Sequence, residues 1–342
     1  MPQITTEELR QYERVTAVQR QVGEVGEWTD EVMQYCLHGE NMAGMKLPWP
    51  FLDERFRFHD GETTVMCGQS GAGKSLLAGQ VALHGMEQKV PALIVSLEMQ
   101  PRSSIARMVR QRSLQAQPGM DDVLDFARWS KGKLWFYRQQ GSINFKTLLA
   151  VLRYTVDNYG VKFIVIDSMM TMGDIPSDDY QGQKRLVLAL TTAARDSGAH
   201  IMLITHARKT ASIDQKLDKF SVAGSADITN LADNVMLLQR THTTEPAAPD
   251  ATFQICKARH FDQGEVTTDL WLDLASMNYY TQWDSPRVVG ENDEDEFSKS
   301  EGTTPTEVGE ITVIDGAKGT SRKHRVPLNG GSRRGSDAVA TG

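Results

Sequence analysis

The sequence has no long apolar run, and this absence excludes a hydrophobic membrane-spanning helix. Of its 342 residues, 40% are hydrophobic, but none of the apolar stretches approaches the roughly 18 consecutive residues that such a helix needs. The N-terminus is polar and lacks the basic block and then the apolar block of a secretory signal. We therefore expect no membrane partner and a cytoplasmic location.

Cysteine and excess positive charge are also scarce. Cys36, Cys67 and Cys256 are the three cysteines, and no two of them form a CxxC pair, which excludes a zinc knuckle and a disulfide framework. Lys and Arg number 37 against 44 Asp and Glu, for a net charge of −7. This balance argues against a surface coated with basic residues for nucleic acid. A local basic loop, or a channel formed by several subunits, stays open.

Two end segments lack the apolar content of a packed core. Residues 1–45 form an N-terminal arm in which Thr5 and Glu8 fit a capping box. We predict one or two exposed helices there, either solvated or packed on another subunit. Residues 285–342 are polar, with an acidic block and then a basic block, and we predict a disordered tail. Between them, residues 46–284 are long enough for one large domain.

The core alternates short apolar runs with helical patterns, which predicts an α/β fold with a mostly parallel sheet covered on both faces. The predicted strands are residues 63–67, 92–97, 133–137, 163–166, 201–204 and 234–238. The predicted helices are residues 75–86, 103–112, 144–158 and 181–197. After residue 250, two alternating strands around residues 261–265 predict a hairpin at the C-terminal edge of the sheet.

The strongest motif in the sequence is a glycine-rich loop between a predicted strand and a predicted helix. It matches GxxxxGK[ST], whose backbone N–H groups surround phosphate oxygens at a helix N-terminus. In this motif the lysine reaches the β- and γ-phosphates and the following serine binds Mg²⁺. The motif therefore predicts an ATP or other NTP site with Mg²⁺. Its residues are Gly68, Gln69, Ser70, Gly71, Ala72, Gly73, Lys74 and Ser75.

Three other predicted strands end in polar residues that belong beside such a site. Asp167 would hold the Mg²⁺ water shell, and Glu98 is a candidate base for the attacking water. His206 could contact the γ-phosphate and report its loss. Ligands bind at the carboxyl ends of parallel strands, so these side chains should face the nucleotide. Taken singly, each also fits a structural role, as a helix cap, a solvated carboxylate or a structural histidine.

The motifs together resemble the replicative ring helicases, the DnaB-like and Twinkle-like members of the RecA-fold ATPases. The resemblance covers about residues 45–280 and is carried by the P-loop with SLEM (96–99), IVID (164–167), ITHARK (204–209), AGSADITNLADNVMLL (223–238) and CKARH (256–260). It is closest to the helicase part of phage primase–helicases, and a phage-encoded chain would work in the host cytoplasm. It implies a RecA-like core, a ring (commonly a hexamer) with ATP between subunits, and single-stranded DNA in the central channel.

The resemblance also assigns roles to single residues. Glu98 matches the catalytic glutamate and His206 the γ-phosphate sensor. Lys257 and Arg259 match the basic pair that a neighbouring subunit inserts at the phosphates, although exposed edge-strand cations are a plain alternative. Arg240 resembles the residue that stacks on the base. In this family a linker helix before the motor packs on the adjacent subunit, which favours that interpretation of the N-terminal arm.

The DNA contact is predicted in the loop that follows the sensor strand. Residues 208–224 contain Lys209, Lys216 and Lys219 and resemble the channel loop of these motors. The loop has little aromatic content, so we predict contact with backbone phosphates rather than base stacking. A solvated loop is the alternative.

The chain departs from the family in having room for neither a primase domain nor a helical N-terminal domain. Priming would then need a separate primase, and the acidic tail weakly resembles one that contacts a DNA polymerase. We expect a ring-forming, ATP-dependent replicative DNA helicase. A RecA/RadA-like recombination ATPase, and a nucleotide-controlled DNA-binding or loading factor without unwinding activity, are the alternatives.

Overall fold

The structure is a computed structural model that describes residues 24–38, 44–138, 141–171, 173, 175–176, 178–207, 217–218, 221–223, 227–241, 245, 247–260, 264–282, 284, 308–314 and 321–327. The chain divides into two compact units, Met1–Gly44 and Met45–Gly342. In the first unit, η1 (Val25–Trp28) leads into α2 (Thr29–His38). The predicted capping box at Thr5 lies outside the described residues.

A nine-stranded sheet organises the second unit, in the order β3-β2-β4-β5-β1-β6-β7-β8-β9. Its first six strands run parallel, and they confirm the six predicted core strands. They are β1 (Thr63–Gly68), β2 (Ala92–Ser96), β3 (Leu134–Phe136), β4 (Phe163–Asp167), β5 (His200–His206) and β6 (Asn234–Arg240). The connections between them are the helical crossovers that parallel strands require.

The last three strands are antiparallel: β7 (Ala251–Ala258), β8 (Val266–Asp273) and β9 (Asn278–Tyr280). The predicted C-terminal hairpin is therefore present as β7 and β8. The outermost strand of the sheet is β9, which the sequence analysis did not predict because three residues carry no readable alternation.

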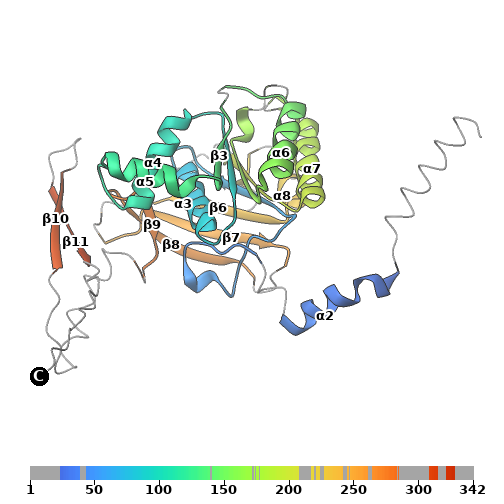
Figure 1. The fold of residues 1–342 in the computed structure, drawn as a ribbon, viewed down its shortest axis with the longest axis horizontal. Helices are drawn as coiled ribbons and strands as arrows, with labels where there is room; N and C mark the ends of the chain where they lie inside the picture. Colours follow the sequence, from blue (N-terminus) through green and yellow to red (C-terminus); the bar gives the residue numbers. More distant parts are fainter. Residues whose placement is uncertain are drawn as a thin grey trace, which may run out of the picture. The chain divides into compact units, whose positions relative to one another are not determined.

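Helices cover both faces of the sheet (Figure 1). One face carries α3 (Lys74–Glu87), α4 (Pro101–Ser113) and α5 (Met120–Ser130), and the other carries α6 (Phe145–Tyr159), α7 (Tyr180–Ser197) and α8 (Asp227–Leu231). The four predicted helices are confirmed as α3, α4, α6 and α7. Short 3₁₀ turns lie at η3 (Pro50–Leu52) and η4 (Met169–Thr171).

Successive strand residues feed two separate hydrophobic cores, because side chains along a strand alternate between the faces. Met66 of β1 and Ile94 of β2 pack with α3, α4 and α5. Their chain neighbours Val65 and Val95 pack with α6, α7 and α8. Burial on both faces explains why these strands read as continuous apolar runs.

Local signals explain where two of the helices begin and end. The Asn144 side chain accepts a hydrogen bond from the Thr147 N–H at 2.8 Å and so caps α6, which ends at Gly160 with φ +64°. Asp179 caps α7 in the same way, and Gly198 ends it. Among the helices in the described part of the chain, none is long and apolar enough to cross a bilayer.

The described part of the C-terminal tail is a pair of strands. Within residues 285–342, β10 (Val308–Ile314) and β11 (Ser321–Pro327) pair as antiparallel strands. The polar composition of the whole tail conceals a short Ile-Thr-Val-Ile run at residues 311–314. Such β-branched residues favour strands.

Candidate active site

The glycine-rich loop joins β1 to α3 in the predicted order. Gly68 ends β1, and a Cβ at this position would clash with the Leu238 carbonyl oxygen of β6, so the close approach of the two strands requires glycine. Lys74 opens α3. The first N–H groups of a helix have no intrahelical partner, so this end of α3 presents donors and a favourable dipole to an anion.

Lys74 folds back onto its own loop. Its ammonium donates to the carbonyl oxygens of Gly68 and Gln69, both at 2.8 Å. Burial lowers the pKa of Lys74, while the negative charges of Asp167 and Glu98 oppose that shift. The lysine is thus held inside the loop, where it can serve as a point-charge partner for phosphate oxygens.

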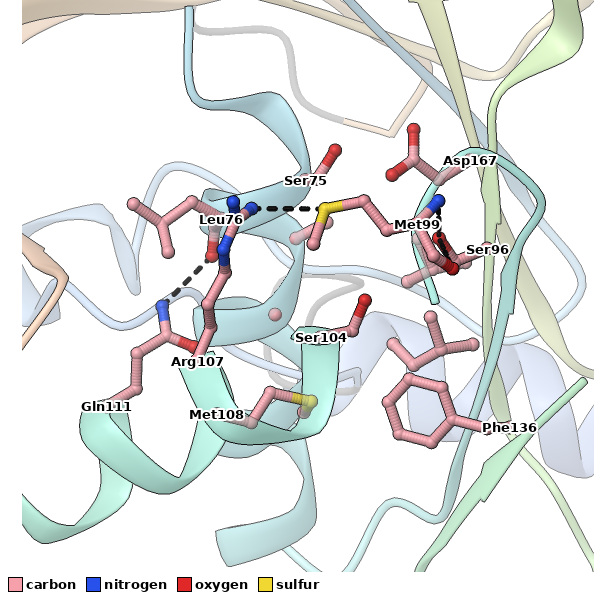
Figure 2. Close-up of a pocket in the computed structure, with 14 residues that line it drawn as sticks. Ser75, Leu76, Ser96, Met99, Ser104, Arg107, Met108, Gln111, Phe136 and Asp167 are labelled. Carbon is pink, nitrogen blue, oxygen red and sulfur yellow. Dashed lines mark hydrogen bonds between the residues drawn. The ribbon is translucent and has the colours of Figure 1, made fainter. Parts of the chain in front are cut away.

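Ser75 and Asp167 face each other at the start of α3 and the end of β4. The Ser75 hydroxyl hydrogen-bonds the Asp167 carboxylate, and burial raises the pKa of Asp167 against the opposing effect of that bond. Figure 2 shows both side chains at the edge of the pocket between α3 and α4. A hydroxyl and a carboxylate are the oxygen ligands that Mg²⁺ prefers, so this donor set fits the predicted metal.

Glu98 lies beside this pair, two residues beyond the end of β2. Its Oε1 accepts a hydrogen bond from the Ser168 hydroxyl at 2.5 Å and lies 3.6 Å from Nε2 of His206. The Glu98 side chain is 41% exposed, so water can reach the carboxylate. The ends of β1, β2, β4 and β5 thus bring together Lys74, Ser75, Glu98, Asp167 and His206.

Sequence reasoning missed two residues at this site. Ser168 follows Asp167 directly, and its contact with Glu98 depends on β2 and β4 being neighbours. Tyr279 of β9 donates from its hydroxyl to the Ala72 carbonyl oxygen at 3.3 Å, within the P-loop. No sequence motif marks this tyrosine, which lies more than 200 residues from the loop.

Lys257 and Arg259 lie near the start of β1, at the opposite end of the parallel strands from the P-loop. Ala258 pairs with Asn234, which pairs with Thr64 near the start of β1. Arg259 forms an ion pair with Asp233, with Nη1 and Oδ1 3.1 Å apart. The structure therefore does not bring this pair to the nucleotide motif of its own chain.

Lys257 has a structural role that the sequence did not indicate. Its ammonium donates to the carbonyl oxygens of Thr229, Asn230 and Ala232 at 2.7–3.1 Å. These carbonyls lie at the C-terminal end of α8, where a cation is favoured by the helix dipole. Within its own subunit Lys257 caps α8.

Arg240 and the loop lysines complete the predicted site residues. Arg240 ends β6 at the P-loop end of the parallel strands. Burial raises the pKa of the Tyr279 hydroxyl, and the positive charge of Arg240 opposes that shift. Lys209, Lys216 and Lys219 lie outside the described residues. A bridge between Ala207 and Val222 links the two ends of their loop.

Comparisons with known proteins agree with this fold. Residues 57–212 match the family model described as "AAA domain". The circadian clock oscillator protein KaiC of a Picosynechococcus species is 30% identical over 114 residues, covering 32% of this chain and 21% of KaiC. The match thus spans about a fifth of that relative's length.

Two solved structures share the architecture. One, described as an ATPase domain, superposes with a TM-score of 0.65 at 14% identity, covering 76% of this chain and 99% of that domain. A DnaB-like replicative helicase, described together with its interactions with primase, gives a TM-score of 0.61 at 16% identity, with 75% and 67% covered. The chain has the RecA-like P-loop fold of these ATPase domains. Fold and motif together define a P-loop NTPase.

Proposed function

We propose that this protein is an ATP-dependent replicative DNA helicase, a ring-forming motor that moves on single-stranded DNA and unwinds duplex. The single observation that carries the proposal is that the proposed catalytic residues lie at two opposite ends of the parallel strands. Lys74, Glu98 and Asp167 meet at the carboxyl ends of the parallel strands, whereas Arg259 lies at the opposite end of β1 and β6.

This division favours a site shared between subunits. Thr64, level with Ala258 just before Arg259, and Gly68, at the P-loop, lie four positions apart on β1, which is about 13 Å of strand. Arg259 is also held by Asp233 on its own side. An arginine so placed can reach a nucleotide only if that nucleotide belongs to a neighbouring copy, as the helicase resemblance implies.

The chemistry would be hydrolysis of the γ-phosphate by water. The water oxygen would bond to the γ-phosphorus while Glu98 accepts a proton from that water. The bond from the γ-phosphorus to the β–γ bridging oxygen would break, the nucleoside diphosphate would leave with that oxygen, and Lys74 would neutralise charge on the phosphate oxygens. The Ser168 hydroxyl holds the Glu98 carboxylate through its Oε1, and Nε2 of His206 lies 3.6 Å from the same oxygen. Ser75 and Asp167 would hold Mg²⁺, and the bound ion would add neutralisation of phosphate charge. Arg259 of a neighbour would stabilise the transferring charge.

The first unit supplies a second argument for a homo-oligomer. Three apolar side chains of η1 and α2 are exposed and follow one another at intervals of three and four residues: Val25 is 85%, Trp28 44% and Val32 52% exposed. A stripe of this kind on a short helix requires a partner to bury it. We assign it to the adjacent subunit of the ring, the partner that the linker helices of the resembling family use.

The further partners rest on resemblance. Single-stranded DNA would contact the loop lysines Lys209, Lys216 and Lys219. A separate primase is a reasonable partner, since the DnaB-like structure of the same fold was studied with one. A DNA polymerase would be contacted through the acidic part of residues 285–342.

Strand displacement on a forked duplex tests the proposal. The purified full chain should displace the strand with ATP, should not do so as Lys74→Ala, and should form closed rings by electron microscopy with a non-hydrolysable ATP analogue and single-stranded DNA. Filaments with strand pairing would instead establish the recombination ATPase. ATP turnover without displacement would establish the loading factor. Either result overturns the helicase proposal.

A further inference from the structure

Tyr279 reaches the P-loop from an edge strand that is distant in sequence. Its hydroxyl oxygen would clash with a Cβ added to Gly73, whose φ is +93°. It therefore occupies the space that a side chain at residue 73 would fill. The same hydroxyl donates to the Ala72 carbonyl oxygen at 3.3 Å. Both contacts involve the Ala72–Gly73 peptide.

The backbone of Tyr279 is fixed to α3 and to the residue before η3 by three hydrogen bonds. Its N–H donates to Oε1 of Gln80 at 2.8 Å, and its carbonyl oxygen accepts from Nε2 of Gln80 at 2.9 Å and from Nε1 of Trp49 at 3.1 Å. Tyr279 itself is 4% exposed. The hydroxyl is thus presented to the loop from a rigid and buried base.

The direction of this contact has a consequence for the loop. In a planar trans peptide the carbonyl and the next N–H point in opposite directions. A Tyr279 hydroxyl that holds the Ala72 carbonyl therefore turns the Gly73 N–H away from Tyr279. In a P-loop the backbone N–H groups supply most of the hydrogen bonds to the phosphates.

We propose that Tyr279 is a positioning residue for the nucleotide phosphates: its hydroxyl fixes the Ala72–Gly73 peptide so that the Gly73 N–H points toward the phosphates. This inference rests on the proposed nucleotide site. It concerns only the phosphate part of the nucleotide, because the Gly73 N–H belongs to the P-loop. Burial raises the pKa of Tyr279 to about 12, so the hydroxyl stays a donor throughout the range of ordinary assays.

The test compares Tyr279→Phe with Tyr280→Phe. The first variant removes only the hydroxyl on the P-loop. The second removes the hydroxyl of the next residue, which hydrogen-bonds Ser276 and Asn278 instead. We expect Tyr279→Phe to bind fluorescent ADP about 2- to 10-fold more weakly, the range for one neutral hydrogen bond, and Tyr280→Phe to match the wild type. Competition by inorganic tripolyphosphate should weaken by the same factor, since this probe has no base.

The steady-state parameters separate positioning from a merely structural role. In Tyr279→Phe the KM for ATP should rise by a similar factor while kcat at saturation changes less, because the hydroxyl does not touch the reacting atoms. The melting temperature should stay close to that of Tyr280→Phe. Equal affinity of the two variants for ADP and tripolyphosphate would overturn the inference and leave the proposed function intact. A wild-type chain that binds neither probe would overturn the proposed function.

A double-mutant cycle gives an independent check. Gly73→Ala should weaken ADP binding, because its methyl group meets the Tyr279 hydroxyl and its φ is strained. Adding Tyr279→Phe removes the closest clashing atom, so the loss in the double variant should be smaller than the product of the two single losses. If the loss of ADP affinity in the double variant equals the product of the two single losses, the hydroxyl does not act through Gly73.

Discussion

Glu98 is the side chain on which the proposed chemistry depends most directly. It is exposed to water, and its Oε1 is held by the Ser168 hydroxyl on one side and lies near His206 on the other. Lys74, in contrast, is buried and bound to the carbonyls of its own loop. This difference is what we expect if Glu98 acts on water and Lys74 acts on phosphate.

Substitutions of Lys74 and Glu98 should therefore have different effects on nucleotide binding and hydrolysis. We expect Lys74→Ala to abolish ATP hydrolysis and to bind nucleotide poorly, because the phosphates lose their main point charge. Glu98→Gln should still bind nucleotide while turnover falls by about 10² or more, the range for loss of a general base. Nucleotide binding and phosphate release, measured on both variants, check this. Equal turnover by wild type and Glu98→Gln would remove Glu98 from the mechanism.

A second residue with a measurable electrostatic effect is His200, which lies away from the nucleotide. Its Nδ1 donates to the His59 carbonyl at 2.8 Å and its Nε2 pairs with the Thr64 hydroxyl at 2.8 Å. Burial is the main cause that lowers the pKa of His200 from 6.5 to about 4, despite the nearby charge of Asp233. In the folded protein this imidazole is neutral at pH 7.

The folded protein should lose stability as the pH falls from about 6.5 to about 4. In this window the unfolded chain protonates residue 200 and the folded chain does not, so the unfolded state binds more protons. The full difference corresponds to about 3 kcal/mol. Glu62 and Asp167 have raised pKa values and act in the opposite sense, so the wild type must be compared with a variant.

Urea unfolding of wild type and His200→Gln at several pH values isolates this contribution. The free energy of unfolding of the variant should depend less steeply on pH between 4 and 6.5. His84→Gln is a suitable control, because burial also lowers the pKa of His84 but its side chain is only half-buried. An unchanged pH slope in His200→Gln would show that His200 takes up its proton over the same pH range in the folded and the unfolded protein.

Among the elements, β9 connects parts of the site that are distant in sequence. Its Tyr279 contacts the P-loop. Asn278 donates to the Gln111 carbonyl of α4 at 2.9 Å, and Gln111 donates in turn to the Met277 carbonyl at 3.1 Å. Because α4 begins three residues after Glu98, one short edge strand is bonded both to the phosphate loop and to the helix that follows the candidate base.

The loop over residues 208–224 is the element to which we assign DNA. Neutralising Lys209, Lys216 and Lys219 together should weaken binding of single-stranded DNA and flatten its salt dependence. The slope of log affinity against log salt should fall by about 0.7 for each DNA phosphate that the protein no longer neutralises. A matched control neutralises Lys131, Lys133 and Lys146, which lie in other parts of the chain. If the loop variant keeps the wild-type salt dependence, the DNA site lies elsewhere.

At the scale of the whole molecule, the role proposed for Arg259 would require an assembly for activity. Arg259→Ala subunits should keep an intact P-loop, but they no longer supply a guanidinium to the nucleotide of the neighbouring subunit. In comparable enzymes the loss of such an arginine lowers the hydrolysis rate by about 10³–10⁵. Mixed with Lys74→Ala subunits, they should form some composite sites with an intact P-loop and an intact Arg259. The mixture should recover part of the ATPase activity that each variant lacks alone.

Arg195→Ala provides the matched control for this experiment. Arg195 also approaches Asp233, with Nη2 and Oδ1 3.6 Å apart, but it has no predicted partner in another subunit, so its loss should leave ATPase activity near that of the wild type. Strand unwinding by the mixture should recover less than ATPase, since a ring motor needs several competent sites in succession. Proven mixed rings without ATPase recovery would contradict the assignment in trans, and normal turnover by Arg259→Ala would exclude it.

What the sequence determined by itself is local or periodic. The P-loop could be predicted because its glycines, lysine and serine lie within eight consecutive residues. The parallel sheet could be predicted because strands that are buried on both faces consist of continuous apolar runs. Asp167, Glu98 and His206 could be placed near the nucleotide because each ends a strand, and parallel strands end at one edge. The three-residue strand β9 escaped because it is too short to show an alternating pattern.

Only the tertiary structure decided which distant residues touch. The contact of Tyr279 with Ala72, the capping of α8 by Lys257 and the bond from Ser168 to Glu98 each join segments that are separated by 25 to more than 200 residues. Such contacts depend on strand order and register, which a single sequence does not specify. A tyrosine at the sheet edge or a lysine on a strand is compatible with many partners, and packing selects one of them.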